Sequence, residues 1–182
     1  MSERGDPQAP SPEQQAKQST SGLAPHASGV RQPEPLFFED FARGYAYETH
    51  SRTVTEADVV AFASLSGDFN PLHTDTTFAK ETIFGERIAH GLLGLAIGSG
   101  LTSRMGIIEG TVLAFLGMTW SFKQPIRIGD TISLRARVAE ARETSRLDRG
   151  VVRFAVEIVN QRSEVVQEGE QVLMVQRRPQ SS

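Results

Sequence analysis

The stretch GLLGLAIGSGLTSRMG, residues 91–106, decides the fold. It is apolar on nearly every side, and the small residues Gly94, Ala96, Gly98 and Gly100 are spaced along it. A helix that is hydrophobic on every face is buried inside a domain. Each interior glycine weakens a helix by about 1 kcal/mol relative to alanine. We therefore expect the rest of the domain to surround this helix closely and to compensate for its weak helical propensity.

The residues that follow this helix have the pattern of long strands. Ile132, Leu134 and Ala136 alternate with polar residues, which is the period of two that a half-buried strand requires. Turn signals such as Ile128-Gly129-Asp130 separate the apolar runs. Short links between consecutive strands indicate antiparallel pairing. The predicted strands are residues 111–125, 131–144, 150–161 and 164–178.

The residues before the helix combine one strand with short helices. YAYETHSRTV, residues 45–54, has the aromatic and β-branched character of a strand. Thr55 and Asp58 have the spacing of a capping box, and the apolar helical spacing that follows ends at Gly67. Asp75 fits the N-cap of a second short helix through Ala79. The pattern predicts one α+β domain over residues 35–178, in which a curled antiparallel sheet surrounds a long central helix.

The two ends of the chain lack the residues of a packed core. Residues 1–35 hold six of the nine prolines and few large apolar side chains, so we expect residues 1–34 to be a disordered leader. Residues 179–182 are expected to be a C-terminal tail. The leader has no continuous apolar core of a secretory signal. The most apolar run, residues 91–101, is shorter than the roughly 20 residues that cross a bilayer. We expect a cytoplasmic protein without a membrane span.

Composition excludes several classes of function. The chain has 182 residues and no cysteine, so thiol catalysis, disulfides and thiolate metal sites are excluded. The formal net charge is -3, and the arginines alternate with acidic and apolar residues instead of forming one basic surface. Nucleic-acid binding usually needs such a clustered basic surface. We therefore expect no nucleic-acid partner.

The stretch DFNPLH, residues 68–73, places an acid and an imidazole on either side of a turn signal. Fully extended, the five steps from Asp68 to His73 span up to about 17 Å, too far for joint action on one small molecule. Pro71 disfavours a helical conformation at Asn70, so the chain is expected to bend there. Such a bend brings the carboxylate and the imidazole to one water molecule, where they would act as base and acid.

Two simpler interpretations of the same residues remain open. The stretch also fits a helix-ending turn with an Asx hydrogen bond from Asp68 and a solvated His73. Alternatively, His73, Asp75 and His90 would hold a metal ion, although their spacing matches no known ligand pattern. We expect no metal.

Gly91 begins the apolar helix and suggests a second element of a site. The first N–H groups of a helix are unpaired and lie at its positive end, where they can hold an oxygen that gains negative charge. A water-activating pair beside such an oxyanion site suits the addition of water to a polarised C=C bond. The alternative for Gly91 is close packing of the helix against a strand.

The stretch FASLSGDFNPLH, residues 62–73, followed by Ala79, resembles the hydratase-2 motif of the MaoC-like (R)-specific enoyl-CoA hydratases. The resemblance continues through IAHGLLGLAIGSGL (88–101) and FKQPIRIGD (122–130). It implies a hot-dog fold, a homodimer or dimer of dimers, and an acyl-CoA or acyl-carrier thioester as substrate. No cofactor is implied beyond the CoA or acyl carrier protein that is part of the substrate.

The resemblance also implies roles for individual residues. Asp68 and His73 would be the catalytic pair, with Asn70 bracing them. The N–H of Gly91 would bind the thioester oxygen, and Ser99 would line the pocket; a small helix residue bonded to its own backbone is the alternative for Ser99. The implied reaction is the reversible hydration of a trans-2-enoyl thioester to the (R)-3-hydroxyacyl thioester.

Two other functions remain open at the level of sequence. A hot-dog thioesterase would attack the carbonyl carbon and release free thiol, and a silent subunit would bind an acyl thioester without turnover. Phe84, Leu95 and Met105 are candidates to close the acyl tunnel. Lys123 and Arg127 either meet CoA phosphates or are solvated charges at strand ends.

Overall fold

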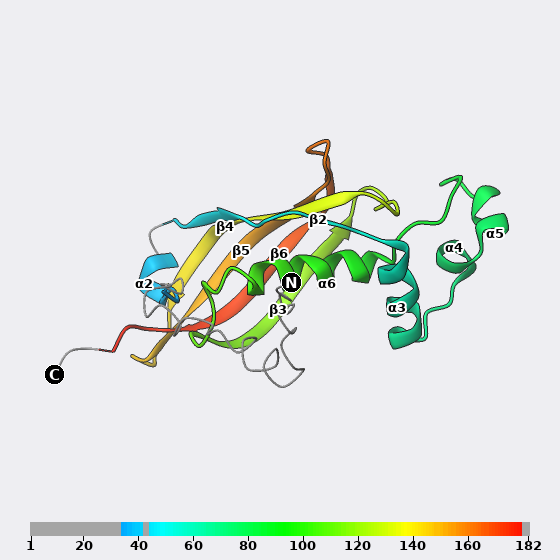
Figure 1. The fold of residues 1–182 in the computed structure, drawn as a ribbon. Helices are drawn as coiled ribbons and strands as arrows, with labels where there is room; N and C mark the ends of the chain where they lie inside the picture. The colour runs from blue at the N-terminus through cyan, green and yellow to red at the C-terminus, as the bar shows by residue number, and fades with distance from the viewer. Residues whose placement is uncertain (1–33, 42–43, 180–182) are drawn as a thin grey trace, which may run out of the picture. The chain divides into compact units, whose positions relative to one another are not determined.

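The computed structural model describes residues 34–41 and 44–179, and a single antiparallel sheet organises them (Figure 1). The strand order is β1-β4-β5-β6-β3, and β2 pairs separately with β4. The predicted α+β class and the four long strands are confirmed. The strands are β1 (Ala46–Glu48), β2 (Arg52–Thr53), β3 (Val112–Phe122), β4 (Thr131–Glu143), β5 (Arg149–Val159) and β6 (Val165–Gln176).

One pairing differs from the expectation that consecutive strands pair. β3 pairs with β6 and forms the free edge of the sheet, whereas β4 lies on the other side of β5. The residues between β3 and β4 make no hairpin because they pair elsewhere. Ala89 N–H donates to Ile126 O over 2.8 Å, and Ile88 forms a bridge with Arg127. The β3–β4 connection therefore pairs with residues 88–89, directly before α6.

The helices confirm most of the predicted boundaries. Thr55 and Asp58 form the capping box at the start of α3, and Gly67 ends it with φ 76°. Burial raises the pKa of Asp58, but hydrogen bonds from Thr55 and the charge of Arg52 outweigh this effect and hold the pKa below its usual value. The helices are α2 (Phe38–Phe41), α3 (Glu56–Ser66), α4 (Pro71–Thr74), α5 (Thr76–Lys80) and α6 (Gly91–Ser103).

Helix α6 packs lengthwise on one face of the sheet, as Figure 1 shows. Leu93, Ile97 and Leu101 join the main core cluster with Ile132 and Ile158. Two glycines bring the helix backbone close to its neighbours. A Cβ at Gly94 would lie 2.5 Å from the Gln167 side chain, and one at Gly98 would lie 3.0 Å from Ile158 Cδ1. The expected close enclosure is therefore confirmed along this face.

The opposite face of α6 is not enclosed, which corrects the expectation of a helix buried on every side. Leu92 is 59% exposed, and a Cβ at Gly100 would have no heavy atom within 4 Å. Apolar side chains of the neighbouring edge strand β3 are also exposed, including Phe115 and Met118. The sheet covers one side of α6 only, because β3 ends the sheet.

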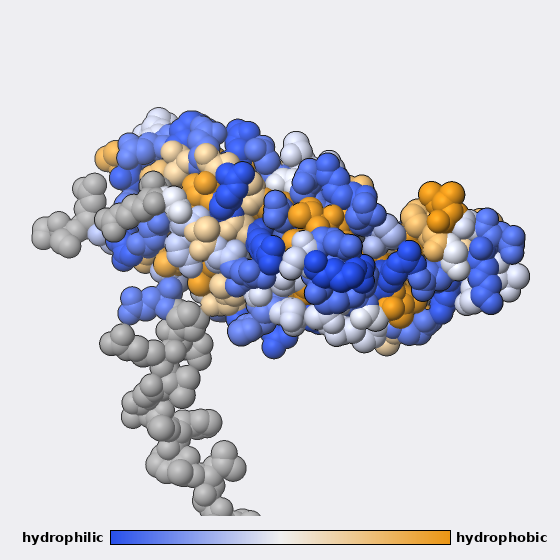
Figure 2. Space-filling model, turned by 90° about the horizontal axis from the view of Figure 1, so that it is seen from above, coloured by the Kyte–Doolittle hydropathy of each residue, from blue (hydrophilic) through white to orange (hydrophobic). Residues whose placement is uncertain are grey.

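Helices α3, α4 and α5 lie beyond one end of the sheet (Figure 1). Apolar surface gathers at this end of the molecule (Figure 2), where Phe69, Phe78 and Ile83 are exposed. No helix among the described residues is long and apolar enough to cross a membrane. The predicted leader and tail lie outside the described residues except for Glu34 and Pro179, so their expected disorder stays a prediction.

The glycines of α6 give a matched test of this packing. Gly98→Ala should lower the free energy of unfolding by about 1–3 kcal/mol, because the added methyl group overpacks the helix against Leu134 and Ile158. Gly100→Ala should raise it by up to about 1 kcal/mol, because the new Cβ enters open space and improves helical propensity. Urea unfolding of both variants measures the difference. Equal effects of the two changes would contradict the packing described.

Candidate functional site

The turn after α3 is held by its own side chains. Asp68 Oδ1 accepts from the Asn70 N–H over 3.2 Å, and Asn70 Oδ1 accepts from the Leu72 N–H over 3.0 Å. Asn70 is the N-cap of α4, and Pro71 occupies the first turn. Proline suits this position because its ring presets the helical φ and no N–H is needed there. The predicted bend at Asn70-Pro71 is confirmed, and so is the Asx hydrogen bond of the simpler interpretation.

His73 is half-buried, which departs from the solvated histidine of the simpler interpretation. Its Nδ1 lies 2.8 Å from the carbonyl oxygen of Ile88. A carbonyl oxygen only accepts, so Nδ1 carries a proton and donates it there. This hydrogen bond fixes the plane of the ring and leaves Nε2 as the nitrogen that can exchange a proton.

His90 connects the turn to the start of α6. Its side chain is buried, with 2% of its surface exposed, and Nε2 donates to the carbonyl oxygen of Asp68 over 2.9 Å. The ring packs in tilted contacts against His73, with centroids 3.8 Å apart, and against Phe62, with centroids 5.0 Å apart. Sequence reasoning considered His90 only as a metal ligand and missed this contact. The only local feature that pointed to a role for His90 was its place directly before Gly91, at the start of the apolar helix.

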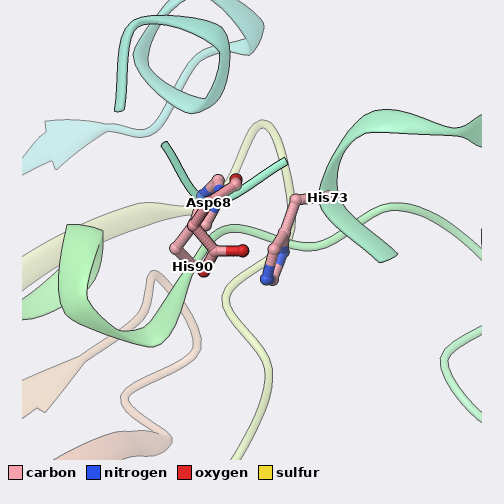
Figure 3. Close-up of side chains that lie close together, drawn as sticks. All are labelled: Asp68, His73 and His90. Carbon is pink, nitrogen blue, oxygen red and sulfur yellow. The ribbon is translucent and has the colours of Figure 1, made fainter. Parts of the chain in front are cut away.

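Asp68, His73 and His90 converge in space (Figure 3), although 22 residues separate the first from the last. One ligand-type atom of each lies within 4.8 Å of the others. The prediction that Asp68 and His73 come together is therefore confirmed as geometry. The metal site considered from the sequence does not form as expected, because Asp68 and not Asp75 joins the two histidines, and the Asp75 side chain instead caps α5.

Gly91 lies at the first position of α6, next to this cluster. The N–H groups of Leu93 and Gly94 both bond to the His90 carbonyl oxygen. The N–H groups of Gly91 and Leu92 have no acceptor among the described residues. A Cβ at Gly91 would lie 2.6 Å from the ring of Phe122, so the close-packing interpretation of this glycine is also supported.

A cavity of about 630 Å³ opens beside these groups. His73, Gly91 and Leu92 line it together with Phe84, Phe122 and Gln167. Ser99 does not line this cavity. It lines a second one of about 250 Å³ farther along α6, with Leu95 and Phe115, and Leu92 borders both. The two cavities thus follow α6 from its first turn along its open face.

Lys123 and Arg127, the two candidates for contact with CoA phosphates, are both paired with acidic side chains. Lys123 lines the larger cavity, and its Nζ lies 2.7 Å from Glu168. Arg127 forms an ion pair with Glu86. Both pairs are exposed, so they contribute little to stability and can exchange partners at small cost.

Comparison with known proteins identifies the family. The model of the MaoC like domain matches residues 40–160, which include the turn, α6 and most of the sheet. The chain belongs to the MaoC-like domain family. The (R)-specific enoyl-CoA hydratase of Aeromonas caviae is 36% identical over 123 residues, which cover 68% of this chain and 87% of the relative.

Two further comparisons bear on the domain. The 3-hydroxybutyryl-CoA dehydratase of Methylorubrum extorquens is 37% identical over 105 residues, 58% of this chain, and the match spans 65% of that relative's length. A structure from Mycobacterium tuberculosis described as a double hotdog fold has a TM-score of 0.72 at 19% identity, covering 81% of this chain and 46% of that one. The chain therefore has the hot-dog fold, as the MaoC-like resemblance implied.

The cap at Asn70 can be tested without an enzyme assay. Asn70→Ala should remove the hydrogen bond to the Leu72 N–H and speed its hydrogen exchange, with a loss of about 0.5–2 kcal/mol of local stability. Asn70→Ser keeps a capping oxygen and should protect the amide nearly as well as asparagine. Amide exchange measured by NMR compares the two. Unchanged protection in the alanine variant would mean that Asn70 does not hold the turn.

Proposed function

We propose that the chain catalyses the reversible hydration of a trans-2-enoyl thioester to the (R)-3-hydroxyacyl thioester. One observation carries this proposal: a carboxylate and an imidazole lie within 4.8 Å of each other, and the imidazole borders the cavity that Gly91 also lines. The curated relatives named as hydratase and dehydratase support the same reaction class. Hydration and dehydration differ only in direction.

In the hydration direction, Asp68 accepts a proton from water while the water oxygen forms a bond to C3. The π electrons of the C=C bond move toward the thioester, whose oxygen becomes enolate-like. His73 orients the water, and its protonated Nε2 delivers a proton to C2, which restores the thioester carbonyl. Return of the proton from Asp68 to His73 completes the cycle. This chemistry uses only the side chains and the thioester, with no further cofactor.

The hydrogen bond from His73 Nδ1 to Ile88 supports this division of labour. Because Nδ1 is occupied by an acceptor, every proton that the ring exchanges with water or substrate passes through Nε2. Asn70 contributes by capping α4 and thereby fixing the spacing of the catalytic pair. The N–H of Gly91 is the proposed donor to the thioester oxygen at the positive end of α6.

The acyl group is proposed to extend from the cavity at Gly91 toward the one lined by Ser99. Leu92 borders both, and the lining of the second cavity is largely apolar, which suits an alkyl chain. Phe84 and Leu95 are placed to limit its length. Lys123 lies at the first cavity and is proposed to approach the phosphates of CoA or of an acyl carrier.

Loss of either catalytic group should lower the hydration rate of crotonyl-CoA by roughly 10²- to 10⁴-fold, the usual contribution of a positioned acid or base. The variants are Asp68→Asn and His73→Ala, and the loss of enoyl absorbance measures the rate. The double variant should lose little more than either single one, because both residues act on one water molecule.

Matched controls are Asp148→Asn and His50→Ala, which make the same chemical changes at exposed positions outside the site. Both should keep the wild-type rate. Wild-type rates in the two catalytic variants would contradict the proposal. Free CoA captured by a thiol-trapping reagent, without formation of a 3-hydroxyacyl product, would assign a thioesterase instead.

A homodimer is also proposed, because the edge strand β3 and the open face of α6 expose apolar side chains. Phe115 is 54% exposed in the single chain, and Leu92 lies on the same side of the domain, at the second cavity. Light scattering after size-exclusion chromatography should give twice the mass of one chain. Phe115→Glu should shift the protein toward the monomer, whereas Leu147→Glu on the exposed β4–β5 turn should not. A monomeric wild type would contradict this proposal.

A further inference from the structure

A buried glutamine bridges the sheet and the first turn of α6. Gln167 lies on β6 with 2% of its surface exposed. Its Oε1 accepts from the Trp120 indole N–H over 3.0 Å, and its Nε2 donates to the Gly91 carbonyl oxygen over 3.0 Å. Indole N–H only donates and a carbonyl oxygen only accepts, so the two partners fix which end of the amide faces which.

The surroundings of Gln167 are shaped to allow this bridge. A Cβ at Gly169 would lie 2.6 Å from the Trp120 ring, so the glycine leaves room for the indole to lie across β6. A Cβ at Gly94 would lie 2.5 Å from Gln167 Nε2, so this glycine lets the amide reach the helix. A buried amide is costly unless both ends are hydrogen-bonded, and here both are.

The hydrogen bond meets α6 where a helix is least stable. Helix ends fray, and α6 begins with a glycine, which has the most backbone freedom. The Gly91 carbonyl oxygen and the Leu92 N–H belong to one rigid peptide plane. Gln167 therefore fixes the orientation of the Leu92 N–H as well, and neither this N–H nor that of Gly91 has an acceptor within the described part of the chain. All three residues line the larger cavity.

We propose that Gln167 is a positioning residue that holds the Gly91–Leu92 peptide, so that the two free amides at the start of α6 stay directed at the thioester oxygen. The inference rests on the proposed function and adds Leu92 N–H as a second donor. Gln167 itself touches no reacting atom. Its contribution passes through the backbone, because preorganised donors stabilise a developing oxyanion better than donors that must reorient.

The first test is Gln167→Met, which keeps the side-chain volume and removes both hydrogen bonds. The kcat for crotonyl-CoA hydration should fall on the order of 10- to 100-fold, less than the 10²- to 10³-fold cost of removing an oxyanion donor outright. KM should change by less than about threefold, because the lost interaction matters mainly in the transition state. Gln176→Met, the same change at the far end of β6, is the matched control and should keep wild-type kinetics.

The second measurement does not depend on turnover. Isotope-edited infrared spectra of bound butyryl-CoA, labelled with ¹³C at the thioester carbonyl, report hydrogen bonding to that oxygen. In the wild type the band should shift to lower frequency, and in Gln167→Met it should return toward the frequency of free ligand. A wild-type band and a wild-type kcat in this variant would overturn the proposal, and so would the absence of any shift in the wild type.

Two further variants cover the case in which Gln167→Met does not fold. Gln167→Glu keeps the acceptor for Trp120 but loses the donor to Gly91, so its infrared shift should be lost at neutral pH and return at low pH, where a protonated carboxyl group donates. Trp120→Phe frees Oε1 and should weaken the shift in the same direction. A full shift in both folded variants would overturn the proposal. If the wild type does not hydrate crotonyl-CoA, but its band is shifted and that shift is lost in the Gln167 variants, the role of Gln167 is supported and the proposed function is refuted.

Discussion

The close approach of α6 to the sheet is the constraint on which the rest of the structure depends. Side chains at Gly94 and Gly98 would collide with neighbours, because their Cβ atoms would lie 2.5 and 3.0 Å away from them. With glycine at both positions, the helix settles deep enough for its first turn to meet β6 and the end of β3. At a larger separation Gln167 would not reach Gly91, and these two residues would no longer line the cavity together. The small side chains that weaken the helix locally are therefore the ones that place it.

Two hydrogen bonds from histidine to backbone join the separate pieces of the site. His73 on α4 donates to the carbonyl of Ile88, and His90 before α6 donates to the carbonyl of Asp68. Each ring thus holds the backbone of the segment that carries the other. Because backbone carbonyls only accept, both bonds also fix the ring tautomers. The proposed catalytic pair, Asp68 and His73, is positioned by these two hydrogen bonds and by the local turn at Asn70, without an ion pair between the two side chains.

The first turn of α6 has little local stabilisation of its own and is held by the neighbouring sheet. Gly91 opens α6 without a side-chain cap: His90, the N-cap residue, makes no capping hydrogen bond, and its Nε2 donates to the carbonyl oxygen of Asp68. The sheet supplies the missing restraint through Gln167, whose amide is itself held by Trp120. In this arrangement a local weakness of the chain is offset by a long-range contact. It also explains why a polar residue occupies a position that faces the core.

The amino-acid sequence alone determined the elements whose signals are local. The capping box at Thr55, the end of α3 at Gly67, the bend at Asn70-Pro71 and the period-two strands all follow from neighbours within a few residues, and the structure has them. The motif of residues 62–73 was also sufficient to indicate the family. Tertiary structure alone decided the pairing of β3 with β6, the contact of His90 with the Asp68 backbone, and the bridge made by Gln167. These contacts join residues that are 22 to 76 positions apart. Sequence periodicity reports which face of an element is apolar, but not which distant element that face will meet.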